Sequence, residues 1–244
     1  VDFYRGKFAE LFVERVRAAG GTLSLNDMRR YKPRWTSTIS IPYGSFMKKN
    51  TAHFAPLPAA AGLVQAQMLQ MLSLKEVFVG ASGIEKYHAL AEVGLTVFAE
   101  RARWLGQNFK SKFPPSAILD SSVAEKAMKN FSRDRHLSPN SFRPVPRPIP
   151  ENPFATSFVI VDRFGMAVTC AFTMNNTFGI GRIAKDTGIM IGAIPQGRGK
   201  GPMSLGPMML INENSNQFLM AVASSGGVTA PTAAASVVAR TYLD

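Results

Sequence analysis

Cysteine is almost missing from this sequence, because Cys170 is the only one among 244 residues. A single thiol cannot form an intrachain disulfide, so a small disulfide-stabilised domain is excluded. Cys170 lies in an apolar segment, where a structural thiol is more common than a nucleophile. Uncharged apolar runs of about 18 residues are also missing, so no membrane span is expected in this sequence.

Acidic residues are scarce as well, with 16 Asp and Glu against 28 Lys and Arg, for a net charge of +12. Such an excess can attract an anionic partner, but the basic residues are scattered and match no nucleic-acid-binding motif. Metal-ligand spacings, a P-loop and a dinucleotide fingerprint are absent too. We therefore expect no nucleic-acid partner, no metal and no cofactor. A basic module that binds anionic surfaces is the least favoured alternative.

The 46% apolar and 18% charged composition is that of a globular protein. Apolar spacing predicts helices first and hairpin-linked strands later, which is typical of an α+β fold with helices layered on an antiparallel sheet. Helices are expected at 3–19, 63–74, 84–105, 121–131 and 232–244, and strands at 31–43, 51–54, 158–161, 166–174, 188–194, 208–211 and 218–223. The sequence begins and ends inside helical patterns, so we expect a fragment truncated at both ends.

A proline-rich segment divides the two halves of this pattern. Six prolines fall within residues 138–153, which favours an extended chain over regular structure. The segment is either an interdomain spacer or a cleavable connection. Directly after it, residues 155–161 read ATSFVIV, so a strand begins with Thr156 near its first position.

Three pieces of the sequence could carry chemistry. Thr156 is a hydroxyl residue at a strand start, which is what an N-terminal-nucleophile (Ntn) hydrolase needs after it has cut its own chain. Residues 173–179, TMNNTFG, end a strand in hydroxyls and amides. Gly226 and Gly227 could present backbone N–H groups to an oxyanion. His88 lies on a predicted helix without a partner at motif spacing, which favours a structural role.

In this order, these pieces resemble the γ-glutamyltranspeptidase (glutathione hydrolase) family. The resemblance covers almost the whole sequence and is carried by residues 20–31, 56–69, 87–106, 155–179, 188–189 and 226–227. It implies an Ntn-hydrolase αββα sandwich with antiparallel sheets, made as a precursor and cut into large and small subunits that become each other's partners. It also implies a small-molecule amide substrate and a periplasmic or secreted location.

The resemblance also implies boundaries within a single domain. Residues 1–137 would be the C-terminal part of the large-subunit region, and 138–154 would be the processing segment. Residues 155–244 would be the N-terminal part of the small-subunit region.

The same resemblance implies roles for individual residues. Thr173 would support the nucleophile's amine, and Asn175 would contact the glutamyl group. Gly226 and Gly227 would form the oxyanion hole. Ser204 would hold the substrate carboxylate.

The sequence departs from the family pattern at three places. Ala155 aligns with the family's nucleophilic threonine, and Thr156 aligns with its neighbour. Leu205 replaces the second of two paired serines. Residues 192–197, GAIPQG, replace an amide- and carboxylate-rich loop that grips the γ-glutamyl amine, which weakens the expectation of glutathione as substrate.

Two hypotheses follow from these departures. In the first, the chain is an autoprocessing hydrolase or acyltransferase that acts on γ-glutamyl or related amides through Thr156. In the second, it is an uncleaved, inactive homologue that binds small molecules. Strand alternation supports the second hypothesis, because Thr156 would point away from the face of Ala155.

Overall fold

The structure is a computed structural model that describes residues 2–44, 49–106, 110–143, 153–194 and 205–243. The chain divides into two compact units. Unit 1 combines Val1–Ser37 with Thr173–Gln196, and unit 2 combines Thr38–Phe172 with Gly197–Asp244. Each unit therefore contains chain from both sides of the proline-rich segment.

Unit 1 contains the helices α1 (Asp2–Arg5), α2 (Lys7–Ala18) and α3 (Leu25–Arg30), and the short strands β5 (Ile183–Ala184) and β6 (Ile189–Met190). Val16 of α2 packs with Ala184 and Ile191 in a small buried cluster. A salt bridge of 3.1 Å joins Arg15 of α2 to Asp186 in the β5–β6 turn. The N-terminal helices are thus fastened to residues that lie far downstream in the sequence.

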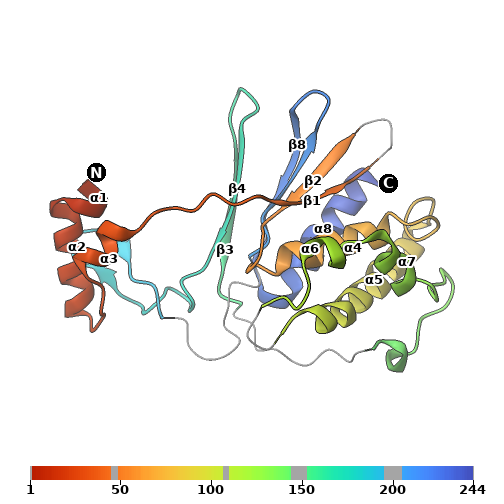
Figure 1. The fold of residues 1–244 in the computed structure, drawn as a ribbon, viewed down its shortest axis with the longest axis horizontal. Coiled ribbons are helices and arrows are strands. Elements are labelled where there is room, and N and C mark those ends of the chain that lie inside the picture. The colour runs from red at the N-terminus through yellow and green to blue at the C-terminus, as the bar shows by residue number, and fades with distance from the viewer. Residues whose placement is uncertain (1, 45–48, 107–109, 144–152, 195–204, 244) are drawn as a thin grey trace. The chain divides into compact units, whose positions relative to one another are not determined.

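Unit 2 is built around a four-stranded antiparallel sheet in the order β1–β2–β7–β8 (Figure 1). Its strands are β1 (Ile39–Pro42), β2 (Asn50–Phe54), β7 (Met208–Asn212) and β8 (Gln217–Val222). Ala52 pairs with Leu210 across the β2–β7 ladder, and both side chains are buried. The central ladder of this sheet therefore joins residues from the two sides of the proline-rich segment.

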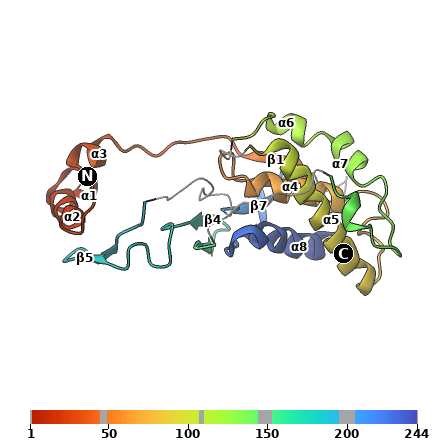
Figure 2. The same cartoon turned by 90° about the horizontal axis from the view of Figure 1, so that it is seen from below.

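Helices gather on one side of this sheet (Figures 1 and 2). They are α4 (Ala61–Leu72), α5 (Gly83–Trp104), α6 (Pro115–Ile118), α7 (Ser121–Ala127) and α8 (Ala230–Tyr242). α4 is buried nearly all round, because it packs against β1, β2, α5 and α8. Leu63 and Leu69 of α4 and Val238 of α8 belong to the main core and have no exposed surface.

A separate hairpin in unit 2 is formed by β3 (Thr156–Val161) and β4 (Ala167–Phe172). The hydroxyl of Thr169 in β4 donates a hydrogen bond of 3.0 Å to the carbonyl of Val222 at the end of β8. Asp162 closes the turn by accepting hydrogen bonds from the amides of Phe164 and Met166. The predicted hairpin is confirmed, with β3 beginning at Thr156.

The α+β class with an antiparallel sheet is confirmed, but some predicted strands were too long. Residues 31–38 are not a strand, since Pro33 lacks an amide donor and only Ile39–Pro42 finds a partner in β2. The strand expected at 188–194 is reduced to the two residues of β6. Part of the proline-rich segment, Pro139–Ser141, forms a short 3₁₀ helix, and residues 144–152 lie outside the described ranges.

A capping box fixes the start of α5. The backbone N–H of Ser82 donates to Glu85, and the Ser82 hydroxyl accepts from the Glu85 backbone N–H. Hydrogen bonds to the Glu85 carboxylate, first from the backbone N–H of Ser82 and then from the Ser82 side chain, lower the pKa of this carboxyl below its ordinary value. A lowered folded-state pKa means that this stabilisation is present above the unfolded-state pKa and is lost as the pH falls through the folded-state pKa.

We therefore expect Glu85→Gln to lower the melting temperature at neutral pH, because a neutral amide replaces the carboxylate at the positive end of the helix. The difference from the unmodified protein should shrink as the pH is lowered below about 4. Thermal unfolding at a series of pH values measures this. Glu125→Gln, in the second half of α7, is the control. An equal loss in acid and at neutral pH would contradict the capping role.

Candidate active site

The junction between the proline-rich segment and β3 is a tight turn. The amide of Ala155 donates a hydrogen bond of 3.0 Å to the carbonyl of Pro153, so the chain folds back over Phe154. The strand then begins, and Thr156 pairs with Phe172 at the end of β4. Thr156 is exposed, whereas Ala155 and Ser157 are partly buried. The strand therefore begins with a threonine that is accessible to solvent.

Gly226 and Gly227 form the turn that leads from β8 into α8. Both have positive φ angles, +133° and +70°, which L-residues with a side chain rarely adopt. A 3₁₀ turn, Gly227–Thr229, follows and continues directly into α8. The glycines thus connect the strand predicted at 218–223 to the helix predicted at 232–244, and both of these elements are confirmed. Backbone N–H groups at such a helix start are partly unsatisfied and carry a positive dipole, so they suit an anionic atom.

The structure brings the junction and the glycine turn together. A Cβ on Gly227 would lie 3.3 Å from the Cα and the Cβ of Pro153 and 3.7 Å from its backbone nitrogen. Gly227 is itself buried. Glycine at this position thus allows the backbone just upstream of Thr156 to lie against the start of α8. The family resemblance implies that the junction and the glycine turn share a site, but nothing in the sequence predicts the contact between Pro153 and Gly227.

Thr173 and Asn175 lie together in unit 1. The amide of Asn175 donates to the Thr173 hydroxyl at 2.9 Å, and its side-chain Nδ2 donates to the Ala193 carbonyl at 2.8 Å. The Ala193 amide in turn donates to the Met174 carbonyl at 2.9 Å. Asn175 has a φ of +65°, which asparagine tolerates better than most residues. This loop therefore presents its hydroxyl and amide groups in a fixed arrangement.

The remaining candidate residues belong neither to the junction and glycine turn nor to the loop of Thr173 and Asn175. Ser204 and part of the 192–197 loop lie outside the described residues. His88 Nε2 contacts the Ser132 carbonyl at 2.9 Å, and its ring stacks on Phe131, which is a structural role. Cys170 is a free, half-buried thiol of β4.

Among the described residues, no cluster of His, Cys, Asp and Glu could hold a metal, and no helix is long and apolar enough to cross a membrane.

Helices on an antiparallel sheet, with a strand that begins at a threonine, match what the sequence led us to expect of an Ntn hydrolase. Cephalosporin acylase from Bacillus halodurans has a similar fold, with a TM-score of 0.68 and 19% identity over 98% of this chain and 44% of that one. The Gamma-glutamyltranspeptidase family profile matches residues 1–193. The chain therefore belongs to the γ-glutamyltranspeptidase family, which confirms the resemblance seen in the sequence.

Individual relatives show the same relationship. Glutathione hydrolase proenzyme of Pseudomonas aeruginosa is 31% identical over 195 residues, which cover 78% of this chain and 33% of the relative. The Bacillus subtilis glutathione hydrolase proenzyme is 25% identical over 257 residues, which cover 93% of this chain and 42% of the relative. Capsule biosynthesis protein CapD proenzyme of Bacillus anthracis is 28% identical over 177 residues, which cover 72% of this chain and 30% of the relative. The chain thus spans less than half the length of these relatives, which are named as proenzymes.

The close approach of Gly227 to Pro153 generates a prediction. We expect Gly227→Ala to push Pro153 away and to weaken the turn in which the Ala155 amide donates to the Pro153 carbonyl. Backbone strain at positive φ should cost about 1–2 kcal/mol in addition. Hydrogen exchange of the Ala155 amide and urea unfolding measure the two effects separately.

Gly80→Ala is the matched control, because Gly80 has a φ of +73° with no atom within 4 Å of an added Cβ. It should show the strain without faster exchange at Ala155. Equal exchange at Ala155 in both variants would contradict the contact.

Proposed function

We propose that this chain is part of an autoprocessing γ-glutamyltranspeptidase-like hydrolase or acyltransferase that uses Thr156 as its N-terminal nucleophile. Its substrates are γ-glutamyl compounds or related amides. The observation that carries this proposal is the position of Pro153 against Gly227, next to the exposed Thr156. It brings the junction to backbone donors at the start of α8. Family membership supports the reaction class.

Autoprocessing would begin with attack of the Thr156 hydroxyl on the carbonyl carbon of Ala155. The C–N bond between Ala155 and Thr156 breaks, the nitrogen takes up a proton, and the Ala155 acyl group becomes an ester on the Thr156 oxygen. Water then hydrolyses this ester, which leaves a carboxylate on Ala155 and a free α-amine on Thr156. Thr156 is exposed at this junction, and the Gly226 and Gly227 N–H groups would stabilise the oxyanion.

Catalysis would then use the new terminus. The Thr156 amine accepts the proton of its own hydroxyl as the oxygen attacks the substrate's amide carbonyl, and it returns the proton to the leaving amine. Water releases the acyl group in hydrolysis, and a second amine releases it in transfer. Thr173 would support the nucleophile's amine, Asn175 would contact the acyl group, and Ser204 would bind its carboxylate.

The residues of this chain specify the acyl group of the substrate less closely than they specify the nucleophile. Residues 192–197 replace the family's amide- and carboxylate-rich loop, and only Gln196 among them has a side chain with a hydrogen-bond acceptor for an α-ammonium group. A site that lacks such partners discriminates weakly in favour of a free amino acid. Relatives of this chain are named for glutathione hydrolysis and for capsule biosynthesis. We therefore propose related amides beside γ-glutamyl compounds as substrates.

The subunit regions follow from this cut. The large-subunit region 1–137 and the processing segment 138–154 would then end at Ala155, and the β-rich small-subunit region would begin at Thr156. The β2–β7 ladder and the packing of α8 on α4 cross this boundary. The two subunits would therefore remain partners through a shared core after the peptide bond is gone.

The catalytic test is a set of three variants of the full-length protein. Thr156→Ala should abolish cleavage, because alanine has no hydroxyl for the acyl shift. Thr156→Ser should retain it, and Ser157→Ala, on the other face of β3, should be cut as the unmodified protein is. Denaturing gels combined with intact mass measure the two fragments. Cleavage at the same bond in Thr156→Ala would contradict the proposal.

The second candidate function is an uncleaved homologue that binds small molecules. It is favoured by the side-chain alternation of β3, because Thr156 lies on the face opposite to Ser157 and to the position of Ala155. This candidate predicts that the full-length protein stays uncut. It also predicts that Ala155→Thr, which restores the family residue, introduces cleavage before residue 155.

A further inference from the structure

A segment without strands runs along helix α5 toward the junction. We call residues 132–143 the strap. Its first carbonyl, that of Ser132, contacts His88 at 2.9 Å, and its last, that of Arg143, accepts a hydrogen bond of 2.8 Å from Arg103. His88 and Arg103 lie about 22 Å apart along the helix axis, at 1.5 Å per residue. The strap therefore follows α5 in the same direction and is fixed at both ends.

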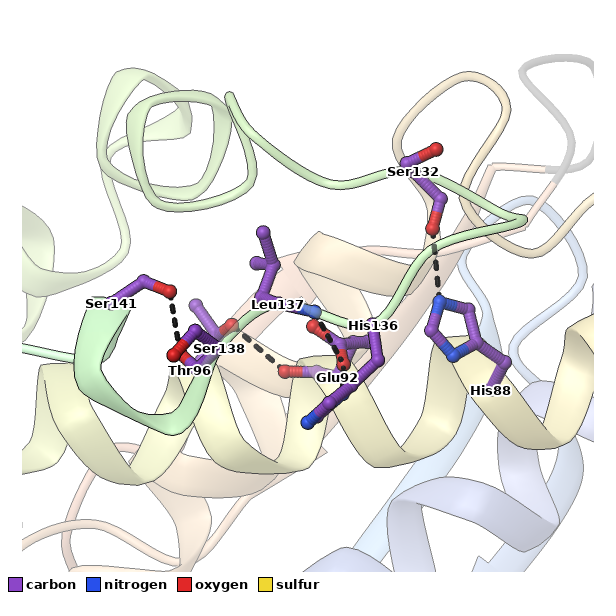
Figure 3. Close-up of polar contacts among 8 residues, drawn as sticks. All are labelled: His88, Glu92, Thr96, Ser132, His136, Leu137, Ser138 and Ser141. Atoms are coloured by element: carbon purple, nitrogen blue, oxygen red, sulfur yellow. Dashed lines mark hydrogen bonds and ion pairs between the residues drawn. The ribbon is translucent and has the colours of Figure 1, made fainter.

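The strap is fastened in its middle by a buried carboxylate. Glu92 of α5 is 1% exposed, and its Oε1 interacts with Nδ1 of His136 and accepts a hydrogen bond of 3.3 Å from the amide of Leu137. Figure 3 shows Glu92 directed at these two neighbouring residues of the strap. The His136 side chain is 56% exposed, so solvent reaches one partner and not the other.

The carboxylate depends on the strap for its hydrogen bonds. Its second oxygen, Oε2, is buried without a hydrogen-bond partner in the described part of the chain. A buried carboxylate is costly unless charged or hydrogen-bonding groups compensate it. Here the compensating groups come from His136 and Leu137. Removing either side of the contact should therefore disturb the other, which is how a latch behaves.

A second anchor defines where a released strap would begin. The guanidinium of Arg133 donates to the carbonyls of Glu76 and Val79, at 2.6 and 2.7 Å, in the loop before α5. The Ser132 hydroxyl also bonds to the Asp134 carboxylate and lowers the pKa of that group. The start of the strap is thus held independently of Glu92, and a released segment would begin after Asp134.

We propose that Glu92 and His136 form a latch that holds the strap on α5 and so positions the chain that leads to the Ala155–Thr156 bond. The positioning part of this inference rests on the proposed cleavage. Nine residues separate Arg143 from Pro153 in the sequence. With the latch open, the downstream end of the strap still has the hydrogen bond from Arg103 to the Arg143 carbonyl. Each time that bond opens as well, the free chain after Asp134 is about twice as long, and the entropy of closing a loop then makes cleavage up to about threefold slower.

The test uses the full-length protein and two independent readouts. The first is hydrogen exchange in residues 134–143, followed by mass spectrometry, and the second is the rate at which newly synthesised chains are cut. His136→Ala and Glu92→Ala should each raise exchange by about ten- to hundredfold, as expected for loss of a hydrogen bond to a charged group. The double variant should add little to either single one, because both remove the same contact.

Two further variants separate the latch from general destabilisation. His136→Asn keeps a short side-chain donor and should restore part of the slow exchange. His53→Ala breaks another His–Glu pair of unit 2, between His53 and Glu213 at 3.4 Å, and should leave the strap unchanged.

Exchange of the strap decides whether the latch exists. Unchanged exchange in His136→Ala, or an equal rise in His53→Ala, would overturn it. A released strap with an unchanged cleavage rate would overturn the positioning role alone. If the unmodified protein is never cut, the proposed cleavage and the positioning role both fail, and the exchange result still decides the latch.

Discussion

The antiparallel pairing of β2 with β7 is the constraint on which the rest of unit 2 depends. These strands lie on opposite sides of the proline-rich segment, and their pairing makes one sheet from two distant parts of the chain. Once β7 is placed, β8 pairs beside it, and the chain must turn at Gly226 and Gly227 to bury α8 against α4. Because Ala235 and Val238 of α8 are fully buried, this turn has little freedom to move.

The position of that turn gives the junction its chemical environment. Gly227 has no side chain, so Pro153 can lie against the start of α8, and Thr156 follows at the exposed beginning of β3. The donors at a helix start and a nucleophile candidate thus belong to one unit. On the upstream side, Glu92 holds the strap on α5 through His136 and Leu137. The proposed cleavage therefore depends on the geometry of the glycine turn, and that geometry depends on the packing of the core.

Local patterns in the sequence predicted much of this fold. The apolar spacing of α2, α4, α5 and α8, and the hairpin turn closed by Asp162, are properties of short segments, and all of them are confirmed. The failures concern elements that depend on distant partners. Residues 31–38 look like a strand by composition but find no neighbour, and the contact between Glu92 and His136 spans 44 residues. Likewise, no pattern in Pro153 or Gly227 alone predicts that they meet. Such contacts are set by the packing of the whole unit.

Most of the proposed chemistry depends on the Ala155–Thr156 junction being a processing site. Its most direct test is the identity of the N-terminal residue of the downstream fragment in the mature full-length protein, determined by N-terminal sequencing and mass spectrometry. Cleavage at this junction predicts that this residue is Thr156 and that it carries a free α-amine. A protein that remains one uncut chain, or a fragment that begins at any other residue, would contradict it.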